Sequence, residues 1–257
     1  YLAIDVVTSS AMYGAAIGDF GSFSTPVTGT TAFASPKNAC TSTSNVTGKI
    51  ALINRGACTF GTKIANAQKA GATAVIVVNN VAGDPIAMGS DEVHFPTIPA
   101  AMVNRPDGTV LMNGAPQTVT IDGTHPHELL TTNADILAGF SSKGPTPYDF
   151  RIKPDVTAPG VNVLSSVFTR NAAGTYTPSY AFFQGTSMAT PHTAGAAALL
   201  LAAHPGWSPE QVKSALVNNA DRTVTGTSGL GPLARGGGRI NVARAMNAAA
   251  PFDPASV

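Results

Sequence analysis

Short apolar runs separated by turn residues fill the first half of the chain. Residues 49–54, 74–78 and 119–121 are each of strand length, and Gly, Pro, Asn or Asp bound them. Between the first two runs, residues 62–70 carry apolar positions at helical spacing, and Gly71 follows as a helix stop. This order of strand, helix and strand predicts a small α/β unit.

The second half of the chain has a different pattern. Gly and Pro recur through residues 126–165, which predicts loop and strand. Residues 187–204 are mostly Ala and Leu around the whole helical circumference, so we expect a helix that is buried on all sides. We place Pro191 in its first turn, where a missing amide hydrogen does no harm.

Two further helices are predicted toward the end of the chain. Residues 208–211, SPEQ, are typical of a helix start, with Ser as the N-cap, Pro at the first position and Gln at the third. This helix should run to about Asn219. Residues 243–249 predict a short closing helix, and residues 251–257 read as a linker to a further region.

Composition excludes several classes of function. Charged residues are only 11% of the chain and the net charge is +1, without a cluster of Lys or Arg, which argues against a nucleic-acid groove. The longest apolar stretch, residues 194–203, is about half of what a membrane span needs. No Cys and His residues have metal-site spacing, so we expect no cofactor; calcium is compatible with the composition but has no motif of its own.

The sharpest chemical feature is the string GTSMATPH at residues 185–192. A serine at the first turn of a helix is exposed at a tight turn, which Gly185 makes possible. The free amides of the helix N-terminus, including that of Ser187, face any negative charge that develops there. A serine at this position is far more often a plain helix cap than a nucleophile, so the residue types alone leave both interpretations open.

The full string, with the TAGAAAL that follows it, closely resembles the serine motif of the subtilisin family over about fifteen positions, with Thr193 for the commoner Val. The stretches GFSSKGP (139–145), KPDVTAPG (153–160) and GRINV (238–242) resemble other parts of that family. The resemblance implies that residues 126–250 are the C-terminal part of a doubly wound α/β catalytic domain. It also implies that Ser187 is the nucleophile, with its N–H as an oxyanion donor. The supporting motif residues are then Gly185, Thr186, Met188, Pro191 and His192.

Residues 28–125 resemble a protease-associated domain, an insertion in some subtilisin relatives that is β-rich α/β. The matching segments include GKIALI (48–53), RGACTF (55–60) and AVIVVNN (74–80). In such relatives the cysteines before and after the first strand pair, which implies a Cys40–Cys58 disulfide that contributes about 3 kcal/mol in the chain-entropy model. Such a bridge indicates an oxidising, extracellular location. Residues 1–27 are a lead-in at the edge of either domain.

The other catalytic residues of the family are not recognisable in this chain. The family orders Asp, His and Ser along the sequence, with the oxyanion Asn also before the serine. Asp5 follows an apolar run, but Val6 and Val7 stand where the family has Thr or Ser and then Gly. Asp155 is expected to brace the backbone. The histidines are expected to be structural or on the surface: His94, His125, His127, His192 and His204.

We therefore expect part of a secreted subtilisin-like serine endopeptidase that cleaves protein or peptide substrates. The chain starts at Tyr1 without a signal peptide, so we expect it to begin inside a longer precursor. Without the N-terminal half of the catalytic domain it should be inactive, because a serine without a base is a weak nucleophile. Loss of a triad member costs about 10⁶ in the turnover of subtilisin. A protein-binding module and a pseudo-protease scaffold are the alternatives.

Overall fold

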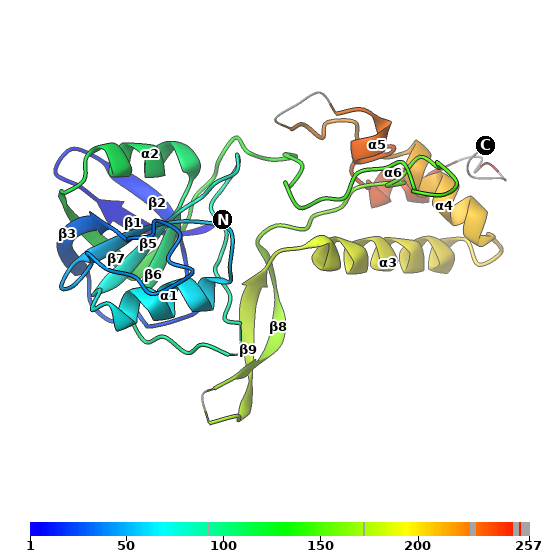
Figure 1. The fold of residues 1–257 in the computed structure, drawn as a ribbon. Helices are drawn as coiled ribbons and strands as arrows, with labels where there is room; N and C mark the ends of the chain where they lie inside the picture. Colours follow the sequence, from blue (N-terminus) through cyan, green and yellow to red (C-terminus); the bar gives the residue numbers. More distant parts are fainter. Residues whose placement is uncertain (92, 172, 227–229, 249–251, 253–257) are drawn as a thin grey trace. The chain divides into compact units, whose positions relative to one another are not determined.

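The computed structural model describes residues 1–91, 93–171, 173–226, 230–248 and 252 (Figure 1). The chain divides into two compact units. The first holds Tyr1–Thr132 with Leu164–Phe182, and the second holds Asn133–Val163 with Phe183–Val257. Helices and strands are mixed, and the central strands are parallel, so the predicted α/β class is confirmed.

The first unit is built on a closed seven-stranded barrel in the order β1-β2-β6-β5-β4-β3-β7. The neighbours from β3 to β6 pair in parallel, and the other pairs are antiparallel. The predicted lead-in segment supplies the first two of these strands. Their bounds are β1 Leu2–Val7, β2 Met12–Ile17, β3 Val27–Phe33, β4 Ile50–Asn54, β5 Ala74–Val78, β6 Ala100–Val103 and β7 Thr118–Glu128.

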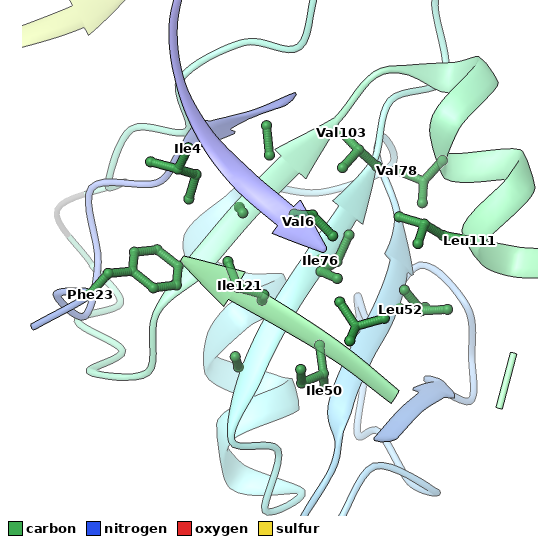
Figure 2. Close-up of a cluster of buried hydrophobic side chains, with 14 residues drawn as sticks. Ile4, Val6, Phe23, Ile50, Leu52, Ile76, Val78, Val103, Leu111 and Ile121 are labelled. Carbon is green, nitrogen blue, oxygen red and sulfur yellow. The ribbon is translucent and has the colours of Figure 1, made fainter. Parts of the chain in front are cut away.

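The strand predictions for β4 and β5 hold because these central strands are buried on both faces, whereas the third predicted strand, in β7, alternates buried and partly exposed residues. All five residues of β5 are buried, as its unbroken apolar run requires. Alternate residues enter different clusters: Ile76 and Val78 join Ile4, Leu52 and Ile121 in the first (Figure 2), while Val75 and Val77 pack with Ile64 in the second. The barrel therefore has two apolar layers of its own.

Two helices accompany the barrel strands. The first, α1 (Phe60–Lys69), starts two residues before the predicted helix because the Thr59 hydroxyl accepts a hydrogen bond from Thr62 N. It ends at Lys69, and the predicted stop Gly71 follows the C-cap Ala70 with a φ of +82°. The second, α2 (Arg105–Asn113), was not predicted and is capped by Asn104.

A two-stranded hairpin follows the barrel in the chain and was also not predicted. Strand β8 (Val163–Arg170) pairs with β9 (Tyr176–Phe183). Its large side chains are mostly exposed, Phe168 by 69% and Tyr180 by 75%. Because exposed apolar residues interrupt the alternation that marks a half-buried strand, the pattern does not reveal this hairpin.

The second unit is mainly helical, and its pairing among the described residues consists of isolated bridges such as Thr157 with Arg239. The predicted start at Ser208 is confirmed as a capping box: the Ser208 hydroxyl accepts from Gln211 N, and Gln211 Oε1 accepts from Ser208 N. The predicted closing helix is shorter, ending at Met246, and the linker residues 251–257 lie outside the described residues except for Phe252. The helices are α3 Thr186–Ala203, α4 Pro209–Asn218, α5 Pro232–Arg235 and α6 Val242–Met246.

The prediction that the Ala-rich helix is buried on all sides is wrong for this chain. Of the α3 residues, only Ala196 and Leu200 are buried, and Leu199 and Leu201 are 53% and 44% exposed. The reason is that α4 and α6, the helices that contact α3, cover one of its faces (Figure 1). A helix that is apolar all round needs neighbours on every side, and the described part of the chain supplies them on one.

Pro191 is also misplaced in the sequence interpretation. The helix begins at Thr186, so Pro191 is its sixth residue and lies inside the helix rather than in the first turn. Because proline has no amide hydrogen, the carbonyl of Ser187 lacks the bond that residue 191 would donate. The first turn of α3, which contains Ser187, therefore has one backbone hydrogen bond fewer to the turn that follows it.

Candidate active site

The turn that leads into α3 depends on Gly185. This residue is the N-cap of the helix, with φ 153° and ψ 164°, a region that glycine almost alone occupies. A Cβ at this position would meet only ordinary contacts, 3.6 Å from Met188 Sδ and from Ser187 N. Glycine is therefore required here for its backbone conformation and not for space.

Ser187 is the second residue of α3 and is exposed. Its amide lies in the first turn and finds no hydrogen-bond acceptor within the described ranges, and its hydroxyl forms no side-chain hydrogen bond there. The next two amides are used, since Met188 N and Ala189 N donate to Gly185 O at 3.1 and 3.4 Å. The site thus offers a free hydroxyl beside a free amide at the positive end of a helix.

A second glycine segment supports this turn. Gly185 N donates to Gly160 O at 2.8 Å, and a Cβ on Gly160 would lie only 2.8 Å from Gly185 O. Residue 160 must therefore be glycine for the two backbone segments to approach each other. Sequence reasoning assigned this stretch by resemblance but did not find the contact.

Two side chains of the motif, Thr190 and His192, form hydrogen bonds within α3. Thr190 Oγ1 donates to Thr186 O at 2.9 Å, and His192 Nδ1 donates to Met188 O at 2.8 Å. These side chains donate to carbonyls four residues earlier in the same helix. His192 is thus oriented toward its own helix backbone.

His204, the other histidine of the second unit, is also committed elsewhere. Its Nε2 donates to Met246 O at 3.0 Å, and its ring stacks on Trp207 with centroids 3.9 Å apart. Neither histidine of this unit is arranged as a base for Ser187 within the described residues.

Asp155 connects three segments of the second unit. Its carboxylate pairs with Lys153 and, at 2.9 Å, with Lys213 of α4, while its carbonyl accepts from Gly237 N at 2.9 Å. Burial alone would raise the pKa of Asp155, but the hydrogen bonds from the two lysines outweigh it and keep the pKa below its ordinary value. Asp155 therefore braces the loop before Gly160.

Three histidines lie in the first unit, near its own acidic residues. His127 Nε2 is 3.9 Å from Asp5 Oδ1 in β1, which is the edge of the ion-pair range. His94 Nδ1 is 2.9 Å from Asp91 Oδ2, a pair that sequence reasoning missed because it is formed by a loop without regular pattern. His125 is exposed and lies 2.8 Å from Thr124 Oγ1.

The predicted disulfide between Cys40 and Cys58 is present, with Cα atoms 5.8 Å apart. It joins the segment before β4 to the segment before α1. Among the described residues, no three His, Cys, Asp or Glu side chains gather as a metal site. In the same part of the chain, no helix is long and apolar enough to cross a membrane.

The start of α3 thus combines a glycine turn with an exposed Ser187. A family model described as "Subtilase family" matches residues 17–237. The chain belongs to the subtilase family of peptidases.

Similar curated proteins come from distant organisms. The chain is 36% identical to the minor extracellular protease Vpr of Bacillus subtilis, over 82% of this chain and 26% of that protein. It is 34% identical to the subtilisin-like protease SBT1.6 of Arabidopsis thaliana (81% and 29%) and 38% identical to the C5a peptidase of Streptococcus pyogenes (70% and 14%). The chain therefore spans less than a third of each of these relatives.

Solved structures are only loosely similar. The subtilisin-like protease Apa1 of Pseudoalteromonas sp. AS-11 has 22% identity and a TM-score of 0.40, over 95% of this chain and 48% of that one. The zinc aminopeptidase BSAP of Bacillus subtilis has 24% identity and a TM-score of 0.39, over 47% and 30%. At these scores neither likeness supports an argument about the site.

Proposed function

We propose that this chain is part of an extracellular subtilisin-like serine endopeptidase and that Ser187 is its nucleophile. The observation that carries the proposal is the exposed hydroxyl of Ser187 beside its own free amide, at a glycine turn into α3. The disulfide and the printed name of the Bacillus relative, an extracellular protease, support secretion. The substrates are proteins or peptides.

The reaction is acyl transfer. Ser187 Oγ attacks the carbonyl carbon of the scissile peptide bond while a histidine base takes its proton. The amide of Ser187 donates to the oxyanion of the tetrahedral intermediate, and the partial positive charge of the α3 N-terminus favours that anion. The amine leaves with the proton, and water then releases the acyl group.

The base and the acid that orients it are supplied by a part of the catalytic domain beyond residues 1–257. The exposed faces of α3 support this division, because the described residues leave Leu199 and Leu201 without apolar cover. The chain alone is then inactive, and the N-terminal half of the domain is its partner. A pseudo-protease would have the same helix without a base.

Ser187→Ala in the complete protein tests the assignment. We expect hydrolysis of peptide substrates to fall by about 10⁶, while unfolding is unchanged because the side chain is exposed. Ser208→Ala is the matched control: it removes the cap of α4 at a cost of about 1 kcal/mol in stability and leaves turnover intact. Retained activity in Ser187→Ala would sink the proposal.

The first unit has the character of an inserted binding module, the protease-associated domain. Its barrel begins and ends at one place: Leu129 N donates to Tyr1 O at 2.9 Å, and Tyr1 N donates to Leu129 O at 3.1 Å. A domain whose two ends are adjacent can be inserted without disturbing its host. The proposed module then includes β1 and β2 together with residues 28–125, because these strands belong to the same barrel.

Excision of residues 1–129 from the complete protein tests this role. We expect cleavage of short peptides to persist and cleavage of folded protein substrates to fall, because the module recruits the larger substrate. Equal loss on both substrates, with the excised protein still folded by circular dichroism, would contradict a recruiting role.

A further inference from the structure

The most unusual side chain of the first unit is Lys63. It lies in α1 and has 0% of its surface exposed, although a lysine is almost never fully buried unless a charge partners it. Within the part of the chain that the structure describes, no carboxylate pairs with Lys63. Burial of an unpaired ammonium costs free energy. The groups that contact the Lys63 amine therefore indicate its role.

Those neighbours are a carbonyl and the disulfide. Lys63 Nζ donates to Asn38 O at 2.5 Å and lies 3.4 Å from Cys40 Sγ. Two carbonyl oxygens lie farther from the same sulfur, Asn38 O at 3.6 Å and Gly56 O at 3.8 Å. Burial lowers the pKa of Lys63 to about 8, so the amine is still mainly protonated at neutral pH. A positive charge therefore sits beside Cys40.

The other half of the bridge lies at the start of α1, where an acidic residue is bound. Cys58 is half-buried and directly precedes Thr59, the cap of α1. Asp91 occupies this end of the helix: its Oδ2 accepts from Thr59 Oγ1 at 2.5 Å, and its carboxylate lies 2.6 Å from where a Cβ on Gly61 would be. This anion offsets the positive end of the helix that would otherwise favour a thiolate at Cys58.

Burial alone would raise the pKa of Asp91, but hydrogen bonds from Thr59, His94 and Val93 outweigh it and hold the pKa far below its ordinary value. Asp91 is thus an anion at neutral pH. Of the two sulfurs, Cys40 Sγ lies 3.4 Å from an ammonium, whereas Cys58 precedes the residue whose hydroxyl donates to the Asp91 anion. An electron pair released from the bridge is therefore more stable on Cys40.

We propose that the Cys40–Cys58 bridge is a thiol-exchange site at which a small thiol attacks Cys58 and Lys63 makes Cys40 the leaving group. The incoming thiolate forms a new S–S bond with Cys58 Sγ as the Cys40–Cys58 bond breaks. The bonding electrons leave on Cys40 as a thiolate beside the Lys63 ammonium. A second thiol resolves the mixed disulfide, so two thiols are oxidised to their disulfide as the protein bridge is reduced.

The segment before β4 keeps other contacts when the bridge opens. Lys63 still holds Asn38 O, and Asn66 Nδ2 donates to Ala39 O at 2.9 Å. Both bonds come from α1, so the exchange is expected to leave the barrel folded while it frees the loop that the bridge closes.

Peptide mapping of trapped exchange products tests the proposal on the 257-residue chain. The folded chain is treated briefly with glutathione near pH 7 and quenched with iodoacetamide, and the adduct on each cysteine is measured by mass spectrometry. We expect glutathione on Cys58 and the alkyl group on Cys40, with a preference of about tenfold or more, since a nearby opposite charge shifts a pKa by at least about one unit. Equal labelling, or glutathione mainly on Cys40, would overturn the proposal.

Two lysine variants separate the role of Lys63 from charge in general. Lys63→Met keeps the length of the side chain without its charge and should abolish the preference. Lys69→Met is the control, because Lys69 is exposed in the last turn of the same helix, and it should keep the preference. A preference that survives in Lys63→Met contradicts the assignment.

A second measurement holds even if Lys63→Met fails to fold. In Cys58→Ser, which retains Lys63 and Asp91, the Cys40 thiol should titrate at least about one unit below the ordinary value of about 8.5. Alkylation rate against pH gives this value directly. A Cys40 thiol with an ordinary or raised pKa would exclude a leaving group stabilised by Lys63.

Discussion

Gly185 and Gly160 show how single residues shape the proposed site. Both are in the motifs that the sequence resemblance identified, but for different reasons: Gly185 for its φ of 153°, and Gly160 because a Cβ would lie 2.8 Å from Gly185 O. The pattern predicted the turn and the exposure of Ser187. It did not predict the contact between the two glycines, because backbone approach between distant segments leaves no periodic signal.

Gly185→Ala should destabilise the second unit by about 1–3 kcal/mol, because alanine is strained in this backbone region. Gly195→Ala is the matched control within α3. No atom lies within 4 Å of its added Cβ, so it should be neutral or stabilise the helix by up to about 1 kcal/mol. Urea unfolding of the 257-residue chain measures both. A cost for Gly185→Ala no larger than that for Gly195→Ala would contradict the conformational argument.

At the scale of elements, the sequence predicted the helices and strands whose formation depends on nearby residues. The strands around residues 50–54 and 74–78, α1 and the Ser208 start of α4 follow from apolar runs and capping residues. The hairpin β8–β9 was not predicted because its apolar side chains are exposed and do not alternate with polar ones. The helix α2 was not predicted because it is short and its apolar positions show a weak helical period. The predicted burial of α3 was wrong because an apolar pattern indicates which neighbours a helix needs and not whether they are present. Among the described elements, α4 and α6 make the main contacts with α3.

The exposed and buried leucines of α3 allow a test of that interpretation. Leu199→Gln should change the stability of the 257-residue chain by less than about 0.5 kcal/mol, because the side chain is 53% exposed. Leu200→Ala should cost about 2–5 kcal/mol, because Leu200 is fully buried against α4 and α6.

In the complete protein the difference between the two leucines should shrink. Leu199→Gln should then be destabilising as well, since a polar group would be buried against the rest of the catalytic domain. Denaturant unfolding of both variants in both proteins makes the comparison. An unchanged Leu199→Gln in the complete protein would mean that this face of α3 stays in solvent.

At the scale of the whole molecule, the chain forms two units that differ in how far their apolar side chains are buried. The barrel unit has closed pairing and two apolar clusters of its own, whereas the helical unit leaves most of α3 exposed. The sequence resemblance predicted an extra domain over residues 28–125 and part of a catalytic domain over 126–250, and both stay predictions. The barrel also includes β1 and β2, which carry no family motif and pair with β7 and β6.

Labelling of Ser187 by a fluorophosphonate probe tests the central claim most directly. The probe reacts with a serine only when a base activates it. The account predicts rapid labelling at Ser187 in the complete protein, located by peptide mass spectrometry, and no rapid labelling in the 257-residue chain. Labelling at another serine of the complete protein would contradict the nucleophile assignment, and rapid labelling of the isolated chain at Ser187 would contradict its dependence on a missing base.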